Sequence, residues 1–269
     1  MNAIEQLSIT GAKIYFEIPV FGGIPITEAQ VNSWIVIVAV AVLCKVLTHK
    51  MKVRPETRRQ IIAEFIVEKA TDFVESNMGT QFRGFAPFIA ALMALSGFSS
   101  LLSIFGMYSP TADLNTIAGW AILVFVLITY YKLKGGLGGY LKSFTQPIFI
   151  LTPFNIISEL ATPVSMMFRH FGNICSGSVI MTLVYAALSV LSTAVFGWLP
   201  GVLGRFPFFQ VGIPVVFSMY FDIFGSLLQA FIFAMLTMMY ISSAAEDGEA
   251  ARAARLARKQ NKKNNKQED

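Results

Sequence analysis

The sequence MFRHFGN, residues 167–173, places an arginine and a histidine inside a long apolar segment. Between Leu160 and Leu199, Arg169 and His170 are the only basic residues, and there is no Asp or Glu. An arginine at the centre of a membrane helix costs about 2.5–3.5 kcal/mol on insertion scales. Because arginine stays charged in proteins, Arg169 must face water, a carboxylate or a partner protein. The segment therefore predicts a membrane helix that carries a functional cation.

The composition is that of a multi-pass membrane protein. Of 269 residues, 55% are hydrophobic and 14% are charged, whereas soluble domains are roughly one-quarter charged. Cys44 and Cys175 lie in apolar stretches without metal-ligand spacing, so they predict neither a disulfide nor a metal site. The sequence contains no phosphate-binding GxxxxGK[ST] loop and no HExxH motif, so we expect no catalytic site and no cofactor.

Apolar runs predict five membrane-crossing helices in an all-α fold. Three runs, from about Val31 to Leu47, Phe85 to Phe105 and Thr116 to Tyr131, are close to the roughly 20 residues that cross a bilayer. Two longer regions extend from about Pro147 to Leu199 and from about Phe208 to Ser243. A helix of about 40 residues measures about 60 Å, twice the hydrocarbon thickness. Each long region is therefore either a hairpin of two short spans or one strongly tilted helix.

The distribution of charge orients the chain. Basic residues cluster at 49–59, at 132–142 and in the C-terminal tail, whereas residues 107–115 contain no Lys or Arg. Basic loops are typical of the cytoplasmic side, so we expect an external N-terminus and a cytoplasmic C-terminus. From an external N-terminus, the three shorter spans carry the chain to the cytoplasmic side. The two long regions together must therefore cross the membrane an even number of times, because the C-terminus is also cytoplasmic.

Glycines are the candidate turns for a hairpin in the long regions. Gly172, Gly177 and Gly225 are only weak candidates, and Gly212 and Pro214 lie too close to the start of the last region to serve. We therefore favour two long tilted helices, joined by an external turn at Pro200-Gly201.

The segment from Pro55 to Met78 has a different pattern. Its apolar residues form a helical stripe opposite several charged side chains, and Gly79 is the expected stop, which is typical of an amphipathic helix on the membrane surface. We expect an external N-terminal segment at residues 1–30, a membrane domain at 31–245 and a basic, disordered cytoplasmic tail at 246–269. A tail of this kind suits anionic lipid rather than nucleic acid.

Three motifs carry a resemblance to a known family. The first motif is PFNIISELATPVSMMFRHFGN, residues 153–173. The second is LQAFIF, residues 228–233, followed by Leu236, Thr237 and Tyr240. The third is PTADLN, residues 110–115. Together they resemble the signatures of subunit a of bacterial F-type ATP synthases. The resemblance runs from the first span to the tail.

The resemblance implies a stator wall beside a rotating ring of c subunits, with b subunits and the rest of the complex as further partners. It implies two offset half-channels for protons or sodium ions, and two long tilted helices that curve around the ring. Arg169 is the residue it assigns to the passing ring carboxylates, with Asn173 and Gln229 as polar neighbours. ATP chemistry would occur in other subunits.

Small and polar residues share a helix face with Arg169. Ser165 and Asn173 lie one turn away on either side, and Gly172 and Ser176 lie on or beside the same face. We expect an ion-path role for Asn173. For Ser165 and Ser176, such a role competes with ordinary small-residue packing between membrane helices.

The last apolar region carries its own polar stripe. Asp222, Ser226 and Gln229 are spaced so that they share one helix face. We assign Asp222 to the external half-channel. The chain departs from the family pattern at Ser178, nine residues after Arg169, where many members have Glu. One carboxylate then serves in place of two, which leaves sodium open beside protons.

Three further residues have competing interpretations. Glu159 matches a family glutamate and either lines the internal half-channel or is an interfacial carboxylate. His170 replaces the family's more usual leucine. Because it points about 100° away from Arg169, a packing role or a lipid-side hydrogen bond competes with a proton relay. Asp113 is either a helix N-cap or a residue of the external cavity.

A transporter is the alternative function. A self-contained secondary transporter could use Arg169 to bind an anionic substrate at mid-membrane, but such folds often show inverted repeats, and the sequence has none. A purely structural scaffold does not explain a charge kept in the bilayer.

Overall fold

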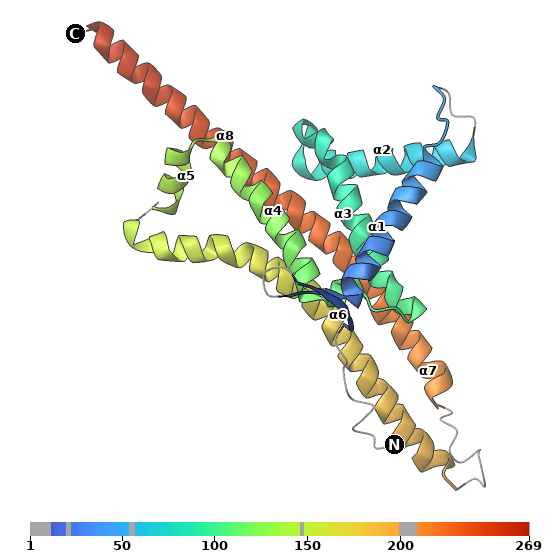
Figure 1. Ribbon diagram of the computed structural model, residues 1–269. Coiled ribbons are helices and arrows are strands. Elements are labelled where there is room, and N and C mark those ends of the chain that lie inside the picture. The colour runs from blue at the N-terminus through green and yellow to red at the C-terminus, as the bar shows by residue number, and fades with distance from the viewer. Residues whose placement is uncertain (1–11, 20–22, 54–56, 146–147, 199–208, 269) are drawn as a thin grey trace. The chain divides into compact units, whose positions relative to one another are not determined.

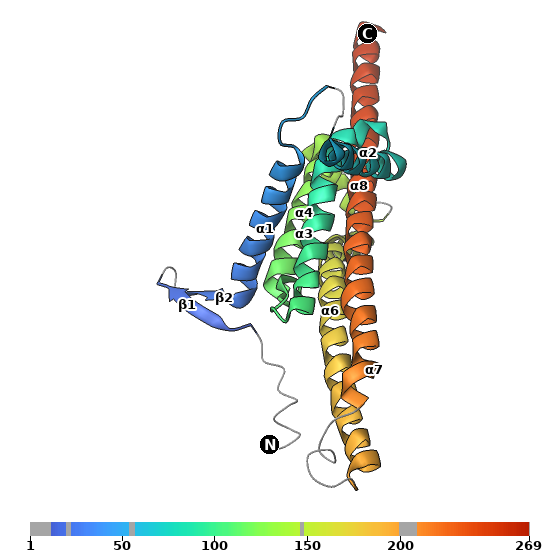
Figure 2. The same ribbon diagram turned by 90° about the vertical axis from the view of Figure 1, so that its right-hand side faces the viewer.

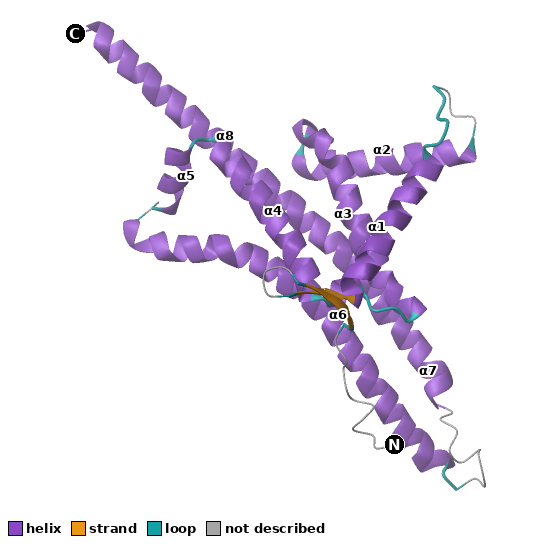
Figure 3. Cartoon of the chain, in the orientation of Figure 1, coloured by secondary structure: helices purple, strands orange, loops and turns teal. Residues whose placement is uncertain are grey.

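The computed structural model describes residues 12–19, 23–53, 57–145, 148–198 and 209–268, and this part of the chain is almost entirely helical (Figure 3). Five described segments are long and apolar enough to cross a membrane: Glu28–Leu47, Thr80–Phe105, Leu114–Lys134, Phe149–Phe196 and Val216–Ala257. The predicted all-α polytopic class is therefore confirmed.

Contacts divide the chain into two compact units, each made of three separate segments. The colour in Figure 1 follows the chain from its N-terminus to its C-terminus. Unit 1 comprises Met1–Ala63, Ala91–Thr116 and Arg169–Ile232, and unit 2 comprises Glu64–Ala90, Ile117–Phe168 and Phe233–Asp269. The two longest helices, α6 (Thr152–Phe196) and α8 (Ser226–Glu268), contribute residues to both units.

Unit 1 begins with a β-hairpin that the sequence did not predict. Strands β1 (Ile14–Ile18) and β2 (Ile24–Thr27) pair antiparallel (Figure 2), and α1 (Glu28–Leu47) follows directly. Near the start of α1, Asn32 is buried and its Nδ2 donates to the carbonyl of Tyr108 at 2.7 Å. This bond ties the first span to the loop after α3 (Ala86–Leu101).

The amphipathic helix is confirmed as α2 (Arg58–Met78). Ile61, Ile62, Phe65 and Ile66 remain about half exposed, as expected of apolar residues that face lipid headgroups and chains. Gly79 ends the helix with a φ of +91°, a conformation that favours glycine. A 3-10 turn, η2 (Thr80–Phe85), then leads into α3.

Unit 2 is built on the packing of α4 (Leu114–Lys134) against α8, which run side by side in Figures 1 and 2. The buried residues of α4 recur every three or four positions: Ile117, Ala121, Val124 and Ile128. They form one apolar stripe. On α8, Phe233, Ala234, Met238 and Ile241 are equally buried.

A glycine crossing brings the C-terminal end of α4 against the middle of α8. A Cβ on Gly135, just after α4, would lie 2.5 Å from the carbonyl oxygen of Gly248, and a Cβ on Gly248 would lie 2.5 Å from that of Tyr131. Only glycine permits so close a backbone approach. A short helix that the sequence did not predict, α5 (Leu137–Phe144), follows this crossing.

The two long apolar regions contain no hairpin within their described residues. Helix α6 is continuous for 45 residues through Gly172 and Gly177. Helix α7 (Phe209–Ser218), the π-helical segment η7 (Met219–Gly225) and α8 form one helical run through Gly225. The preference for two long helices is confirmed, whereas the expected turn at Pro200-Gly201 lies outside the described residues.

The C-terminal tail differs from the prediction. Helix α8 continues to Glu268, where we expected a disordered tail. Residues 250–257 (AARAARLA) consist of alanine, arginine and leucine, which have the highest helix propensities. Charge had suggested disorder, and local propensity favours helix instead.

Candidate functional site

Arg169 lies on an exposed face of α6. Its side chain is exposed, as are those of Ser165, Asn173 and Ser176, and Gly172 is exposed with them. All four neighbours lie within about 60° of Arg169 around the helix axis at 100° per residue. Arg169 makes no ion pair or hydrogen bond with any side chain that the structure describes. The face is shallow, with one fixed charge that remains available to a partner.

The adjacent face of α6 is buried. Met166, His170, Gly177 and Met181 are all buried, and they lie between about 60° and 120° from Arg169. The exposure of His170 is 0%, and its Nε2 lies 3.3 Å from Ser96 Oγ on α3. The prediction that His170 points away from Arg169 is therefore confirmed, and His170 belongs to the interior of unit 1.

Asp222 lies in the π-helical segment η7, although its side chain lies outside what the structure describes. π-Helical turns are rare and are frequent at functional sites. Here the last carbonyl of the turn has an outside partner, because Asn173 Nδ2 donates to Gly225 O at 3.1 Å. The structure therefore brings the Arg169 face of α6 beside the start of α8.

Ser226 and Gln229 follow on α8, but they do not share the exposed surface. Ser226 is 2% exposed and Gln229 is 4% exposed. Both lie in unit 1, as do Arg169 and Asn173. Their burial distinguishes them from the exposed residues of α6. The polar side chains of Ser226 and Gln229 therefore lie in the interior of unit 1.

Glu159 forms an ion pair within unit 2. Its Oε2 lies 2.6 Å from Lys132 Nζ, at the end of α4, and its Oε1 is buried without a hydrogen bond from a described residue. The pair borders a cavity of about 80 Å³ whose lining includes Thr162, Ser243 and Asp247. Burial and the Glu159 carboxylate raise the pKa of the nearby Tyr140 hydroxyl, which stays neutral.

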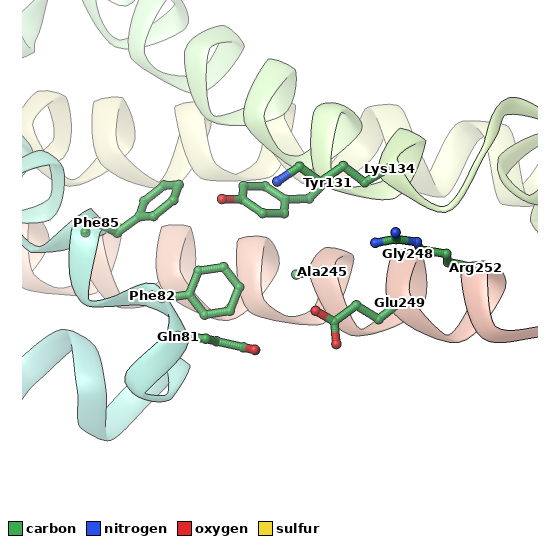
Figure 4. Close-up of a pocket in the computed structure, with 10 residues that line it drawn as sticks. Gln81, Phe82, Phe85, Tyr131, Lys134, Ala245, Gly248, Glu249 and Arg252 are labelled. Atoms are coloured by element: carbon green, nitrogen blue, oxygen red, sulfur yellow. The ribbon is translucent and has the colours of Figure 1, made fainter.

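A larger pocket of about 690 Å³ lies elsewhere in unit 2 (Figure 4). Phe82, Phe85 and Tyr131 contribute aromatic rings, and Glu249 and Arg252 come from α8. Lys134 Nζ lies 4.6 Å from the centre of the Tyr131 ring, within the range of a cation–π contact. None of the predicted ion-path residues lines this pocket.

Two predicted residues have local roles in the structure. Asp113 precedes α4, and its Oδ1 accepts a hydrogen bond from the backbone N–H of Asn115 at 2.9 Å, which is the geometry of a helix N-cap. Ser178 is exposed about 180° from Arg169 around α6. Its hydroxyl donates to the Cys175 carbonyl at 2.8 Å.

Sequence reasoning missed a group of buried hydroxyls in unit 1. Ser100 Oγ lies 2.8 Å from Thr111 Oγ1, which lies 2.7 Å from Ser109 Oγ. All three residues are at most 6% exposed. The only sequence signal is the polar run Ser96 to Ser100 in an otherwise apolar helix, which is also compatible with ordinary helix packing.

Fold and site together define a polytopic membrane protein with a fixed cation on the exposed face of a long apolar helix. Such intramembrane charges mark ion or substrate paths. Residues 30–242 match the family described as ATP synthase A chain, and the chain belongs to this family. It is therefore a membrane-embedded, ion-transporting part of the ATP synthase complex, with the role of subunit a.

Individual relatives cover most of the chain. ATP synthase subunit a 2 of Bradyrhizobium sp. strain BTAi1 is 32% identical over 225 residues, which span 83% of this chain and 91% of the relative. ATP synthase subunit a of Legionella pneumophila strain Paris is 29% identical over 230 residues, spanning 85% and 90%. The sodium ion specific subunit a of Propionigenium modestum is 29% identical over 244 residues, spanning 84% and 77%.

Proposed function

We propose that this chain forms the wall past which a ring of c subunits turns, and that Arg169 meets each ring carboxylate in turn. The proposal is carried by Arg169 itself, which is exposed on a face of small residues and unpaired among the described side chains. A guanidinium can bind a carboxylate through two parallel charge-assisted hydrogen bonds. It also lowers the pKa of an approaching carboxylate, so the ring site releases its ion before it passes.

Two half-channels give ions access to the ring from opposite sides. We assign the external one to Asp222, Asn173, Ser226 and Gln229, supported by the π-helical segment and the bond from Asn173 to Gly225. We assign the internal one to Glu159, supported by the cavity that its ion pair borders, which has room for two to three water molecules at about 30 Å³ each. Arg169 separates the two because a fixed cation repels ions that would leak between them.

The orientation follows from the loop charges. We place the N-terminus outside and the C-terminus in the cytoplasm of a bacterial cell, with b subunits among the partners. The length of α6 supports a strong tilt, because 45 residues measure about 68 Å, more than twice the hydrocarbon thickness. A tilted pair of helices offers a long surface to a ring.

Cysteine cross-linking tests the contact with the ring. Ser176 lies on the Arg169 face, and Ser178 is also exposed but lies on the opposite side of α6. In a chain whose Cys44 and Cys175 are alanine, Ser176→Cys should form a disulfide with a cysteine placed beside the ring carboxylate, whereas Ser178→Cys should not. Equal cross-linking at both positions, or purification of the chain without ring and ATPase subunits, would contradict the proposal and favour a self-contained transporter.

A further inference from the structure

The pocket of about 690 Å³ in unit 2 lies where the apolar parts of the helices end (Figure 4). Helix α4 carries Lys132 and Lys134 in its last turn. Helix α8 is apolar to about Ser243, and charged residues then follow, among them Glu249 and Arg252. A change from apolar to charged residues marks the boundary between membrane and water. The pocket therefore lies at the level of the lipid headgroups.

Three aromatic side chains form one wall of this pocket. The ring centres of Phe82 and Phe85 lie 5.7 and 5.9 Å from that of Tyr131, and 6.0 Å from each other. Phe82 is 6% exposed, and Phe85 and Tyr131 are half-buried. Rings at these separations pack favourably against one another. The wall is therefore a fixed apolar surface, which suits the glycerol backbone and the first acyl carbons of a lipid.

Three charged side chains line the same pocket. Lys134, Glu249 and Arg252 are all exposed, and none of them forms an ion pair with a residue that the structure describes. Lys134 Nζ lies 4.6 Å from the ring centre of Tyr131 and 5.1 Å from that of Tyr130. These cation–π contacts orient the ammonium group without neutralising it. The pocket thus offers two cations and one carboxylate to a ligand.

The mixture of charges selects the headgroup. Lysine and arginine bind phosphate through charge-assisted hydrogen bonds, whereas a carboxylate beside them repels a phosphate. A headgroup with an ammonium group as well as a phosphate removes this conflict. In Figure 4 the Glu249 carboxylate is directed toward the side of the pocket that carries Gln81 and Phe82. An ammonium group there can pair with the carboxylate and lie over the aromatic ring.

We propose that this pocket binds phosphatidylethanolamine, a phospholipid whose headgroup carries one phosphate and one ammonium group. The phosphate lies beside Lys134 and Arg252, and the ammonium group lies beside Glu249. The lining residues come from η2, α4 and α8, so the bound lipid joins three elements of unit 2. None of the predicted ion-path residues lines the pocket. The lipid site is therefore separate from the proposed function.

Photochemical labelling in vesicles tests the site in the intact complex. The complex is reconstituted into phosphatidylglycerol vesicles that contain a minor fraction of phosphatidylethanolamine with a photoactivatable group near the start of one acyl chain. Mass spectrometry then identifies the labelled peptides. We expect labelling within residues 80–85 and 245–252, although phosphatidylglycerol is in large excess. Photoactivatable phosphatidylglycerol in phosphatidylethanolamine vesicles should label the same residues about fivefold less, because it has no ammonium group for Glu249.

Three variants separate the charges of the pocket. Arg252→Gln should reduce labelling by phosphatidylethanolamine about fivefold, because the phosphate loses a partner. Glu249→Gln should remove the preference, so that the two lipids label within about twofold of each other. Arg255→Gln is the matched control, because it removes the same charge from the same helix and Arg255 does not line the pocket. It should label like the parent. All three positions are exposed, so we expect the variant complexes to assemble.

Soluble phosphoethanolamine separates the lipid from its headgroup. In excess it should leave the labelling unchanged, because it lacks the acyl chains that hold a lipid at the membrane. Competition by the soluble headgroup would overturn the lipid site in favour of a free ligand. Equal labelling by the two lipids in the parent complex would overturn the selection of an ammonium group. Undiminished labelling of Arg252→Gln, or an equal loss in Arg255→Gln, would overturn the pocket as the binding site.

Discussion

Arg169 and His170 are neighbours in sequence with opposite environments. Successive residues turn by about 100° around a helix, so the arginine lies on the exposed face of α6 and the histidine lies against α3. The exposed residue suits a moving partner, and the buried one suits a fixed network. Two different roles can therefore occupy adjacent positions without competing for space.

The Lys132–Glu159 pair is a second charged feature within the apolar helices. Both side chains are mostly buried, with 22% and 16% exposed. Removing one partner of such a pair leaves the charge of the other partner buried and uncompensated in a low-dielectric environment. We expect Lys132→Met to destabilise the protein by about 1–3 kcal/mol, between the values for exposed and fully buried pairs. Thermal unfolding of the purified complex measures this loss.

A double variant separates charge from packing. Lys132→Met combined with Glu159→Gln removes both charges, and it should recover most of the stability lost in the single variant. Ion pumping should still be impaired, because the carboxylate that we assign to the internal half-channel is gone. A double variant with unchanged pumping would count against that assignment.

Single residues were predictable where their chemistry contrasts with the sequence around them. Arg169 and Glu159 stand out because a charge in an apolar helix requires a reason. Ser100 and Thr111 do not stand out, because hydroxyls are common in membrane helices and their contact joins residues 11 positions apart. Lys132 was assigned to a cytoplasmic loop, and only the packing of α4 and α6 in unit 2 reveals its partner.

At the scale of elements, α4 and α8 depend on their glycine crossing. Gly248→Ala would place a methyl group 2.5 Å from the Tyr131 carbonyl oxygen. Although alanine favours helix, this overlap should destabilise the protein by about 1–3 kcal/mol. The thermal midpoint of the purified complex should fall accordingly.

Gly119→Ala is the control for this substitution. Gly119 also lies within α4, and a Cβ added there would meet no described atom within 4 Å beyond its own helix backbone and chain neighbours. The variant should be neutral or stabilised by up to about 1 kcal/mol, since alanine is the better helix former. Equal destabilisation of both variants would mean that the crossing is not what Gly248 provides.

Helices were more predictable than short elements. Apolar runs gave the three shorter spans to within five residues at each end, because burial in lipid leaves a long and uniform signal. The β-hairpin and α5 were missed, because each is short and its stability depends on neighbours distant in sequence. The tail helix was missed because its charge was weighted above its alanine content.

At the scale of the whole molecule, five crossings should leave the termini on opposite sides of the membrane. The C-terminus follows the basic residues 252–266, which favour the cytoplasm. Green fluorescent protein fused after Asp269 should therefore fluoresce in cells, and alkaline phosphatase at the same position should be inactive. An active phosphatase there would reverse the orientation and exchange the two half-channels.

The central claim is that Arg169 couples ion flow to a moving ring. Replacing Arg169 with alanine in the intact complex, reconstituted into vesicles, tests it most directly by ATP-driven ion pumping. We predict that pumping is lost while the variant chain still assembles with the ring and the ATPase subunits. Coupled pumping at the rate of the parent complex would contradict the account.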